Sequence, residues 1–380
     1  MTALLLFSCG LYGLLGVVLY RRLGALFAEE PEPQRWEPTV SVIIAIRNEA
    51  PHLGACLDSI AALDYPAEKL EVILIDDDSN DGSARLLQDF CRAHPRMCTL
   101  RLGHGEKSLP GKAGAAYAGI QQSSGEILFV TDADCRVPPG WIRHLLAAFT
   151  DEVGLVGGFT FLEYTPGGAR FAALQALDWL YLLGIAAAAI RMNKPLSWMG
   201  NNMAFRRSAY LAVGGYPALG HSLIEDFALL DAISRTSRWR VRVTPAPEAS
   251  VVSLPVATLP AFYRQRRRWA LGVRQVRLFG KLLMGTSLVS RAGLLVALCC
   301  GHPAPWATLA ALLVLLAGDF AICRKMARAT GQGGLLRYFP AFELFYFTYG
   351  LCLPLLLPFD RRIRWKDQTY PAQQNRPVRA

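Results

Sequence analysis

The chain contains 380 residues, of which 52% are apolar and 18% are charged. Disordered chains combine low hydrophobicity with high net charge, so this composition excludes disorder over most of the length. The 40 basic and 30 acidic residues give a net charge of +10, which favours an anionic partner such as a phosphate or a lipid headgroup; no nucleic-acid partner is expected. The nine cysteines include no CxxC pair, so neither a zinc ribbon nor a thioredoxin-type site is expected.

The N-terminal segment has the length and composition of a membrane span. Residues 2–20 carry no charge and are followed at once by Arg21 and Arg22. A signal peptide carries its positive charge before the apolar run, whereas here the charge follows it. The positive-inside rule then places the N-terminus outside and Arg21 onward in the cytoplasm. We therefore predict an uncleaved transmembrane anchor over residues 1–24.

Residues 38–260 show the alternation of strands and helices that is typical of an α/β domain. The predicted strands are Val40–Ile46, Leu70–Ile75 and Glu126–Thr131, and the predicted helices are His52–Leu63, Ala84–His94, Lys112–Gln121 and Trp141–Ala148. Such alternation indicates βαβ units and a mostly parallel sheet, whose ligands bind beyond the carboxyl ends of the strands. The expected fold class is therefore α/β, with transmembrane helices at both ends of the chain.

One apolar stretch inside this domain needs a separate interpretation. Residues 171–190 are apolar enough to resemble a span, but they contain Gln175 and Asp178. A crossing at this point would divide the predicted domain. We predict a buried or membrane-hugging helix instead.

Acidic residues follow the second predicted strand. Asp76, Asp77 and Asp78 come directly after its apolar run. Carboxylates at the end of a parallel strand are placed to accept hydrogen bonds from a nucleoside base or ribose. A simpler interpretation is a polar turn that caps the next helix.

The third predicted strand also ends in acid, at Asp132-Ala133-Asp134. Two carboxylates two residues apart can share a divalent cation, and Mg²⁺ and Mn²⁺ prefer carboxylate and diphosphate oxygens as ligands. A DxD triplet alone is a weak signal. It gains weight here because it follows an apolar strand and accompanies a second acidic strand end.

A third acid pair, Glu225-Asp226, opens an apolar helical stretch. Acids at this position stabilise the positive end of a helix dipole, which is the simpler explanation. The alternative is a general base that takes a proton from an acceptor hydroxyl.

The basic segment Tyr263–Trp269 combines four arginines with a glutamine and a tryptophan. On a helix, Gln265, Arg268 and Trp269 share one face, which offers an amide, a guanidinium for phosphate oxygens and a large ring. The other arginines would be free to meet anionic lipid headgroups. They are Arg264, Arg266 and Arg267. We predict an amphipathic interface helix over residues 261–290; the alternative is an ordinary basic stretch beside a membrane.

The C-terminal third is predicted to be a transmembrane region over residues 291–360, followed by a cytoplasmic tail over residues 361–380. Basic residues follow two apolar stretches, at Arg324-Lys325 and after residue 360. Both basic clusters favour the cytoplasm, yet one apolar stretch lies between them. Either residues 338–359 enter and return, or residues 292–301 do not cross.

Taken in order, these motifs resemble family 2 glycosyltransferases, in particular the membrane branch of cellulose, hyaluronan and chitin synthases and ceramide glucosyltransferases. The matching motifs are Ile75-Asp76-Asp77-Asp78-Ser79, Asp132-Ala133-Asp134, Glu225-Asp226 and Gln265-Arg266-Arg267-Arg268-Trp269. Supporting matches are Ser41–Glu49, Gly111–Ala115 and Gly200–Arg207. Two departures are the Asp78 carboxylate where glycine is frequent in the family, and the lack of a recognisable gating loop after Trp269.

The resemblance implies a GT-A-like, Rossmann-type domain and an inverting, metal-dependent hexosyltransferase. Its donor would be a nucleotide-diphosphate sugar, most often UDP-linked, and its acceptor a lipid or a glycan. The protein would be integral to the membrane, the inner membrane if bacterial, with a cytoplasmic catalytic domain.

The resemblance also implies a role for each motif residue. Asp76 or Asp77 would bind the base, with Lys112 along the nucleotide. Asp134, helped by Asp132, would hold Mg²⁺ or Mn²⁺ on the diphosphate, and Arg268 would stabilise the charge on the leaving group. The catalytic base would be Asp226, in the acid pair with Glu225, and Gln265 and Trp269 would shape the acceptor site.

Two alternatives stay open at this point. A processive polysaccharide synthase would share these motifs, although the small number of C-terminal spans favours a single transfer to a lipid. A non-catalytic subunit that binds nucleotide sugars would be expected to lack Asp226 or the DxD acids, and the chain has both.

Overall fold

The computed structural model describes residues 2–29, 36–95, 97–103, 107–220, 224–272, 276–300, 304–357, 362–365 and 368–371. By contacts, the chain divides into two units, each described here by itself. The helical unit comprises Met1–Glu29, Leu162–Leu196 and Pro255–Ile363, and the sheet unit comprises Glu30–Phe161, Ser197–Leu254 and Arg364–Ala380. Most of the predicted tail lies outside the described residues. Its described parts are two paired strands, β10 (Arg362–Trp365) and β11 (Gln368–Pro371).

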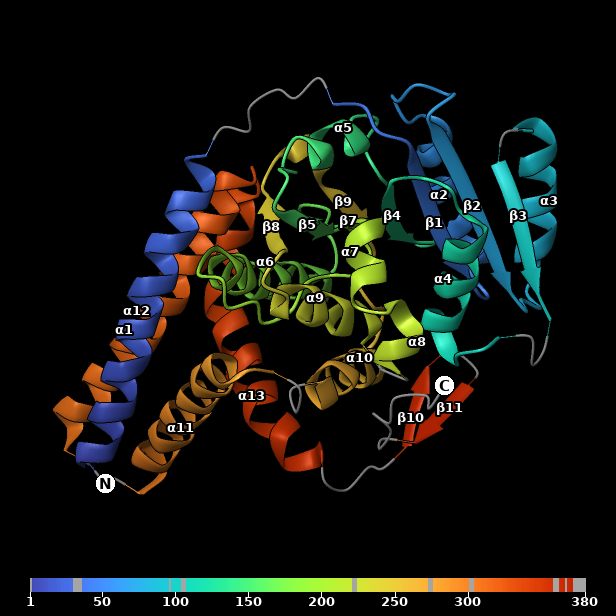
Figure 1. The fold of residues 1–380 in the computed structure, drawn as a ribbon. Coiled ribbons are helices and arrows are strands. Elements are labelled where there is room, and N and C mark those ends of the chain that lie inside the picture. The colour runs from blue at the N-terminus through green and yellow to red at the C-terminus, as the bar shows by residue number, and fades with distance from the viewer. Residues whose placement is uncertain are drawn as a thin grey trace. The chain divides into compact units, whose positions relative to one another are not determined.

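A seven-stranded sheet with the order β3-β2-β1-β4-β7-β5-β8 forms the centre of the sheet unit (Figure 1). Its strands are β1 (Val40–Ile46), β2 (Leu70–Asp77), β3 (Met97–Leu102), β4 (Ile127–Asp132), β5 (Val153–Gly158), β7 (Met203–Arg206) and β8 (Arg240–Thr244). β1 pairs in parallel with β2 and β4, and β2 with β3. β7 is antiparallel to both β4 and β5, whereas β8 is parallel to β5. The strands β6 (Thr160–Leu162) and β9 (Val251–Ser253) form a small second sheet.

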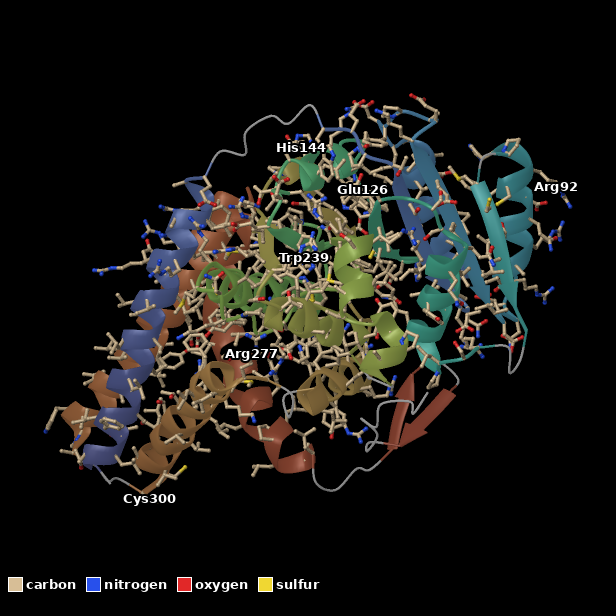
Figure 2. The ribbon with its side chains drawn as sticks, viewed as in Figure 1. Arg92, Glu126, His144, Trp239, Arg277 and Cys300 are labelled. Atoms are coloured by element: carbon tan, nitrogen blue, oxygen red, sulfur yellow. The ribbon has the colours of Figure 1, made fainter. Side chains whose placement is uncertain are left out.

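The helices of the sheet unit cover these strands. They are α2 (Ala50–Ala61), α3 (Ser83–Ala93), α4 (Gly111–Gln122), α5 (Trp141–Leu146), α7 (Arg207–Ala212), α8 (Gly215–Leu219), α9 (Glu225–Arg235) and the 3-10 turn η1 (Pro247–Ala249). β1 and β4 are buried along nearly their whole length, as expected for parallel strands covered on both faces. The edge helix α3 is amphipathic: Leu87 is buried, and Arg92 points away from the sheet (Figure 2).

The predicted strands and helices are present. β1 has the predicted bounds, and β2 and β4 extend to Asp77 and Asp132, so the strands themselves carry the acids to the edge of the sheet. The helices α2, α3, α4 and α5 begin and end within two residues of the predicted bounds. The prediction of a mostly parallel α/β domain is therefore confirmed.

The helical unit contains α1 (Thr2–Phe27), α6 (Arg170–Arg191), α10 (Leu259–Gly272), α11 (Leu278–Cys300), α12 (Pro305–Ala329), the 3-10 helix η3 (Gly333–Tyr338) and α13 (Phe339–Leu356). Among the described residues, five helical segments are long and apolar enough to cross a membrane. They are α1, α6, α11, α12 and η3 with α13. α6 is the most deeply buried of them.

Two boundaries in the structure differ from those predicted from the sequence. The segment Leu162–Leu196, which includes α6, clusters with the helical unit, so the predicted domain of residues 38–260 contains an insertion. The predicted interface segment 261–290 is divided between α10 and α11. At 1.5 Å per residue the 23 residues of α11 extend for about 34 Å, so residues 292–300 belong to a helix of spanning length.

The helices α1 and α12 run side by side in the same direction (Figure 1). A Cβ atom on Gly13 would lie 3.0 Å from the Val314 side chain, and one on Gly24 would lie 2.5 Å from Lys325 Nζ. The two contacts are eleven residues apart on each helix, from 13 to 24 on α1 and from 314 to 325 on α12. The two helices are therefore parallel. The basic residues near the C-terminal ends of α1 and α12 therefore lie at the same end of this pair.

A buried ion pair joins two of these helices. Arg291 on α11 donates to the Asp319 carboxylate on α12, which also accepts from the hydroxyls of Tyr12 and Tyr181. The exposed fractions of Arg291 and Asp319 are only 2% and 0%. Separating these helices would leave a charge unpaired in an apolar interior, which is costly, so the ion pair and its hydrogen bonds hold the helices together.

Candidate active site

The acids of two strands meet at one edge of the sheet. In the strand register, Asp76 of β2 lies beside Ile46 of β1, and Asp132 of β4 lies beside Ala45 of β1. The carboxyl ends of three adjacent parallel strands thus lie together. This is the edge at which α/β proteins bind their ligands.

Asp76 and Asp77 are both buried and both held by polar partners. The Asp76 carboxylate accepts from the Ser79 backbone N–H at 3.1 Å and lies 3.7 Å from Arg101 Nε. Lys107 Nζ lies 2.6 Å and 2.7 Å from the two oxygens of Asp77. Lys107 was not among the residues predicted from the sequence. It neutralises an acid that would otherwise be buried without a counter-charge.

The backbone conformation of Asp78 explains why an aspartate can replace the glycine that is frequent at this turn. Its φ angle is +57°, in the left-handed region that glycine adopts freely. Aspartate is one of the few other residues that tolerate this conformation. The carboxylate at position 78 is therefore compatible with a turn at which glycine is frequent.

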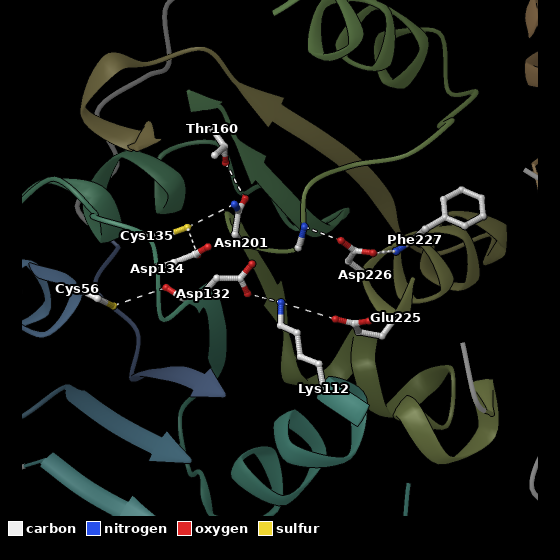
Figure 3. A network of polar contacts seen from close by, with 11 residues as sticks. Cys56, Lys112, Asp132, Asp134, Cys135, Thr160, Asn201, Glu225, Asp226 and Phe227 are labelled. Carbon is white, nitrogen blue, oxygen red and sulfur yellow. Dashed lines mark hydrogen bonds and ion pairs between the residues drawn. The ribbon is translucent and has the colours of Figure 1, made fainter. Parts of the chain in front are cut away.

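Lys112 links the second and third acidic motifs (Figure 3). It lies in the first turn of α4, where it forms an ion pair with Asp132 and lies 3.6 Å from Glu225 Oε1. Burial alone would lower the pKa of Lys112, but the negative charges of Asp132 and Glu225 outweigh burial and raise it. The ammonium group stays charged at the N-terminus of a helix, a position suited to binding a phosphate.

Asp134 and Asp132 form the part of the site that fits a divalent cation. Oxygens of these two acids and the Cys135 sulfur lie within 4.8 Å of one another. Burial, followed by the charges of Asp134 and Asp132, raises the pKa of the Cys135 thiol well above its usual range, which disfavours the thiolate that binds metals. The two carboxylates remain as donors, and oxygen donors suit Mg²⁺ or Mn²⁺ better than a soft metal. Cys135 in turn accepts a hydrogen bond from Asn201 Nδ2 at 3.4 Å.

Asp226 lies at the start of α9, next to the loop that contains Asn201 (Figure 3). Its two oxygens accept backbone N–H groups of Gly200 and Phe227, each at 2.7 Å. Burial and then the Glu225 charge raise the pKa of Asp226 to about 6, against the opposing effects of Lys112 and the two backbone donors. A carboxylate with a pKa near neutrality has the basicity that general-base catalysis requires.

Gly200 is required for this placement of Asp226. A Cβ atom at position 200 would lie 2.6 Å from Asp226 Oδ2 and 2.7 Å from Asp226 Cβ, which is closer than such atoms can approach. We expect Gly200→Ala to move the carboxylate and to lower the turnover number by about 10- to 100-fold, because small misplacements of a catalytic group have effects of that size. The measurement is steady-state transfer kinetics.

The matched control for this prediction is Gly54→Ala on α2. A Cβ atom at position 54 would meet nothing within 4 Å. It is expected to leave turnover unchanged, since alanine is favourable within a helix. Equal turnover in Gly200→Ala and the unaltered chain would contradict the positional requirement.

The fourth motif lies on α10 of the helical unit. Gln265, Arg268 and Trp269 are half-buried on this helix. The expectation that Arg266 and Arg267 are free to face lipid headgroups is wrong, because each is only 4% exposed. Arg264 is exposed.

The described structure thus brings together three of the four predicted motifs in the sheet unit. Asp132, Lys112 and Glu225 form a continuous chain of ion pairs. Asp134 accepts a hydrogen bond from Cys135, whose sulfur accepts one from Asn201, and Asp226 accepts one from the neighbouring Gly200 of the same loop. Sequence reasoning missed Lys107 and the specific roles of Gly200 and Asn201. The motif match over residues 200–207 was the available signal for the last two.

The sheet unit has the fold of GT-A-type glycosyltransferases. The profile of the family described as Glycosyl transferase family 21 matches residues 2–378, so the chain belongs to that family. The family is part of the wider clan of family 2 glycosyltransferases. The resemblance inferred from the four motifs is therefore confirmed at the level of the family.

The chain is also similar to named proteins, at about 30% identity. A beta-monoglucosyldiacylglycerol synthase from Synechocystis sp. is 28% identical over 242 residues, which cover 62% of this chain and 48% of that protein. An N-acetylglucosaminyltransferase from Rhizobium meliloti is 31% identical over 269 residues, covering 67% of this chain and 60% of that protein. The chain spans about half the length of the curated relatives that it matches.

A solved structure shares the fold. The mannosyltransferase from Pyrobaculum calidifontis, in complex with GDP-Man and Mn²⁺, aligns with a TM-score of 0.61 and 20% identity, covering 90% of this chain and 99% of that chain. At this identity the likeness supports the GT-A fold of the chain.

Proposed function

We propose that the chain is a membrane-bound inverting glycosyltransferase that moves a sugar from a nucleotide-diphosphate donor, preferably UDP-linked, to a lipid acceptor at the inner leaflet. The observation that carries the proposal is the half-buried chain of charges from Asp132 through Lys112 to Glu225, next to Asp226, at the carboxyl edge of the sheet. A carboxylate whose pKa is raised towards neutrality, held beside other charges at this edge, supports a catalytic role. The relatives named beta-monoglucosyldiacylglycerol synthase support a lipid acceptor.

The donor would be bound by the strand-end residues. The proposal assigns base and ribose recognition to Asp76 and Asp77, which end β2. Lys112 would meet the diphosphate, since its charge lies in the first turn of α4. Binding the donor phosphates at Lys112 would compete with its present ion pairs to Asp132 and Glu225.

Asp226 would act as the general base. Its carboxylate takes the proton of the acceptor hydroxyl while the hydroxyl oxygen attacks C1 of the sugar from the side opposite the diphosphate. The bond between C1 and the phosphate oxygen breaks, and the nucleoside diphosphate leaves with that electron pair. A single displacement of this kind inverts the anomeric centre. The Gly200 and Phe227 backbone donors orient the carboxylate throughout.

Asp134 and Asp132 would hold Mg²⁺ or Mn²⁺. A divalent cation in this position supplies positive charge to the diphosphate as it leaves. Arg268 would add a guanidinium, which forms paired hydrogen bonds with phosphate oxygens. Gln265 and Trp269 would bind the acceptor, Gln265 through its amide and Trp269 through its ring.

The proposed membrane arrangement uses α1, α11 and α12 as spans and has residues 338–359 enter and return, so that the sheet unit and the tail both lie in the cytoplasm. α1 and α12 are parallel, so Arg21 and Arg22 are at the same end of this pair as Arg324 and Lys325. By the positive-inside rule that end is cytoplasmic.

The acid limb of the pH profile follows from the raised pKa of Asp226. Protonation below about pH 6 removes the base, so kcat/KM is expected to rise with pH and to level off above this value. Glu225→Gln should move the midpoint to lower pH, because the Glu225 charge is one cause of the raised pKa. The measurement is transfer rate against pH at low donor concentration. A midpoint that Glu225→Gln leaves unchanged would contradict this coupling.

The same shift has a consequence for stability. The folded-state pKa of Asp226 lies above its ordinary value of 3.8, so the native state binds this proton more tightly than the unfolded state does. Its contribution to stability is therefore full below about pH 4 and is lost as the pH rises through about 6.

The decisive test is a screen of radiolabelled nucleotide sugars against a total lipid extract, using the purified full chain. Transfer of label into a lipid, followed by identification of the product, would support the proposal. High-molecular-weight labelled product on a gel would favour a processive synthase instead. A relative named poly-beta-1,6-N-acetyl-D-glucosamine synthase, 25% identical over 252 residues, supports this alternative. Binding of UDP without hydrolysis or transfer of any donor would contradict an enzymatic role.

A further inference from the structure

The helical unit contains a buried acid that contacts the basic motif helix. Asp178 lies on α6, is fully buried, and forms an ion pair with Arg266 of α10. Its second oxygen accepts from the hydroxyl of Tyr349 on α13. The aspartate thus joins three helices at one point. The mechanism proposed above does not explain this buried charge in a largely apolar helix.

Arg266 carries this interaction to the tryptophan of the motif. Its guanidinium carbon lies 4.2 Å from the ring centroid of Trp269, with Phe262 on another side at 4.4 Å. Arg266 and Trp269 are three residues apart, so they share one face of α10. A guanidinium stacked on an indole keeps this geometry only while its own position is fixed.

α6 also holds α10 at two further points. Trp179 contacts the Trp269 ring, with the centroids 5.3 Å apart and the planes at 63°. Gln175 pairs with the backbone just before α10: its Oε1 accepts from the Val256 N–H at 3.1 Å and its Nε2 donates to the Val256 carbonyl at 2.9 Å. Three side chains of α6 therefore hold the motif segment: Gln175 binds the backbone before α10, Asp178 binds Arg266, and Trp179 contacts Trp269.

We propose that Asp178 is a positioning residue for sugar transfer: through the Arg266 guanidinium it orients the Trp269 ring for acceptor binding. The inference rests on the proposed function, because it assigns Trp269 to the acceptor. It predicts that loss of the Asp178 charge affects use of the acceptor and spares the donor.

The chain offers a matched control in the same unit. Arg291 and Asp319 form an ion pair that is buried as deeply and is also bonded to a tyrosine hydroxyl, Tyr12. The rings on which Arg291 lies belong to Tyr12 and Tyr346, outside α10. Asp319→Asn therefore breaks a similar pair without touching the motif helix.

The first test compares Asp178→Asn with Asp319→Asn in the purified full chain, using UDP-glucose and diacylglycerol in detergent micelles. Asp178→Asn is expected to lower kcat/KM for diacylglycerol by about 10- to 100-fold and to change the KM for UDP-glucose by less than about twofold. Asp319→Asn is expected to lower the thermal unfolding temperature while the two KM values stay unchanged. Adding Asp178→Asn to Arg266→Met should cost less than about threefold more, because both act through one guanidinium.

A second measurement needs no substrate. In the full chain labelled with 5-fluorotryptophan, the Trp269→Phe variant identifies the ¹⁹F resonance of Trp269. Asp178→Asn is expected to shift or broaden this resonance, and Asp319→Asn to leave it in place. An unchanged Trp269 resonance, or the same kinetic profile in both variants, would overturn the positioning role. If the unaltered chain transfers no sugar, the proposed function fails, and the ¹⁹F measurement still decides the orientation of Trp269.

Discussion

The Asp226→Asn variant is expected to bind the nucleotide-sugar donor with nearly unchanged affinity and to transfer sugar at least about a hundredfold more slowly. The substitution keeps the size of the side chain and removes the negative charge that takes the acceptor proton. Donor affinity is spared because the donor contacts are assigned to other residues, such as Asp77 and Lys112. The measurements are calorimetric binding of UDP and single-turnover transfer.

A control is needed because Asp226 also accepts two backbone hydrogen bonds. An asparagine side chain keeps one acceptor and loses the other, which costs roughly 1–2 kcal/mol of stability. Thermal unfolding separates this cost from the loss of catalysis. Asp231→Asn is the matched variant, since Asp231 lies on the same helix and bonds Arg235. Unchanged turnover in Asp226→Asn would remove this residue from the role of base.

Removal of divalent cations is expected to abolish transfer, and addition of Mn²⁺ or Mg²⁺ to restore it. Without the cation, the carboxylates of Asp132 and Asp134 would face the negative charges of the donor diphosphate, although Asp132 keeps its ion pair with Lys112. Repulsion between these anions opposes donor binding as well as catalysis. The measurement is transfer in the presence of a chelator, followed by titration with each cation.

The corresponding variant is Asp134→Asn, which should raise the cation concentration that gives half-maximal activity by about tenfold or more. Asp89→Asn is its control, because Asp89 lies on α3 and is 53% exposed. Full activity in the chelator would leave Asp132 and Asp134 as residues of a structural turn. A response to one cation and not the other would define the metal.

The parallel part of the sheet was predictable because its strands carry their own signal. β1, β2 and β4 are continuous apolar runs that end in acid or in a turn, and buried parallel strands have this pattern. The strands β3, β5, β7 and β8 of the main sheet were not predicted. β3 is largely exposed and β8 alternates between exposed and buried positions, so neither is a continuous apolar run. Their place in the sheet depends on tertiary pairing.

The candidate site was predictable as a set of residue types and not as a set of partners. The acids at positions 76, 132 and 226 follow from strand ends and a helix start. The pairing of Lys107 with Asp77 depends on a loop whose course the sequence does not specify. Likewise, Arg266 and Arg267 read as exposed cations in the sequence, because nothing near them in the chain indicates that Asp178, 88 residues away, neutralises Arg266.

The parallel contact between α1 and α12 bears on the order of biosynthesis. Tyr12 and Gly13 meet partners that the ribosome makes some three hundred residues later, at Asp319 and Val314. In the proposed membrane arrangement, the first helix therefore stays in the bilayer without α12 while residues 28–304 are translated. A chain truncated before residue 305 would lack α12, so the first helix would never gain this contact. A shortened chain that retains every catalytic acid is thus expected to be a target for membrane quality control.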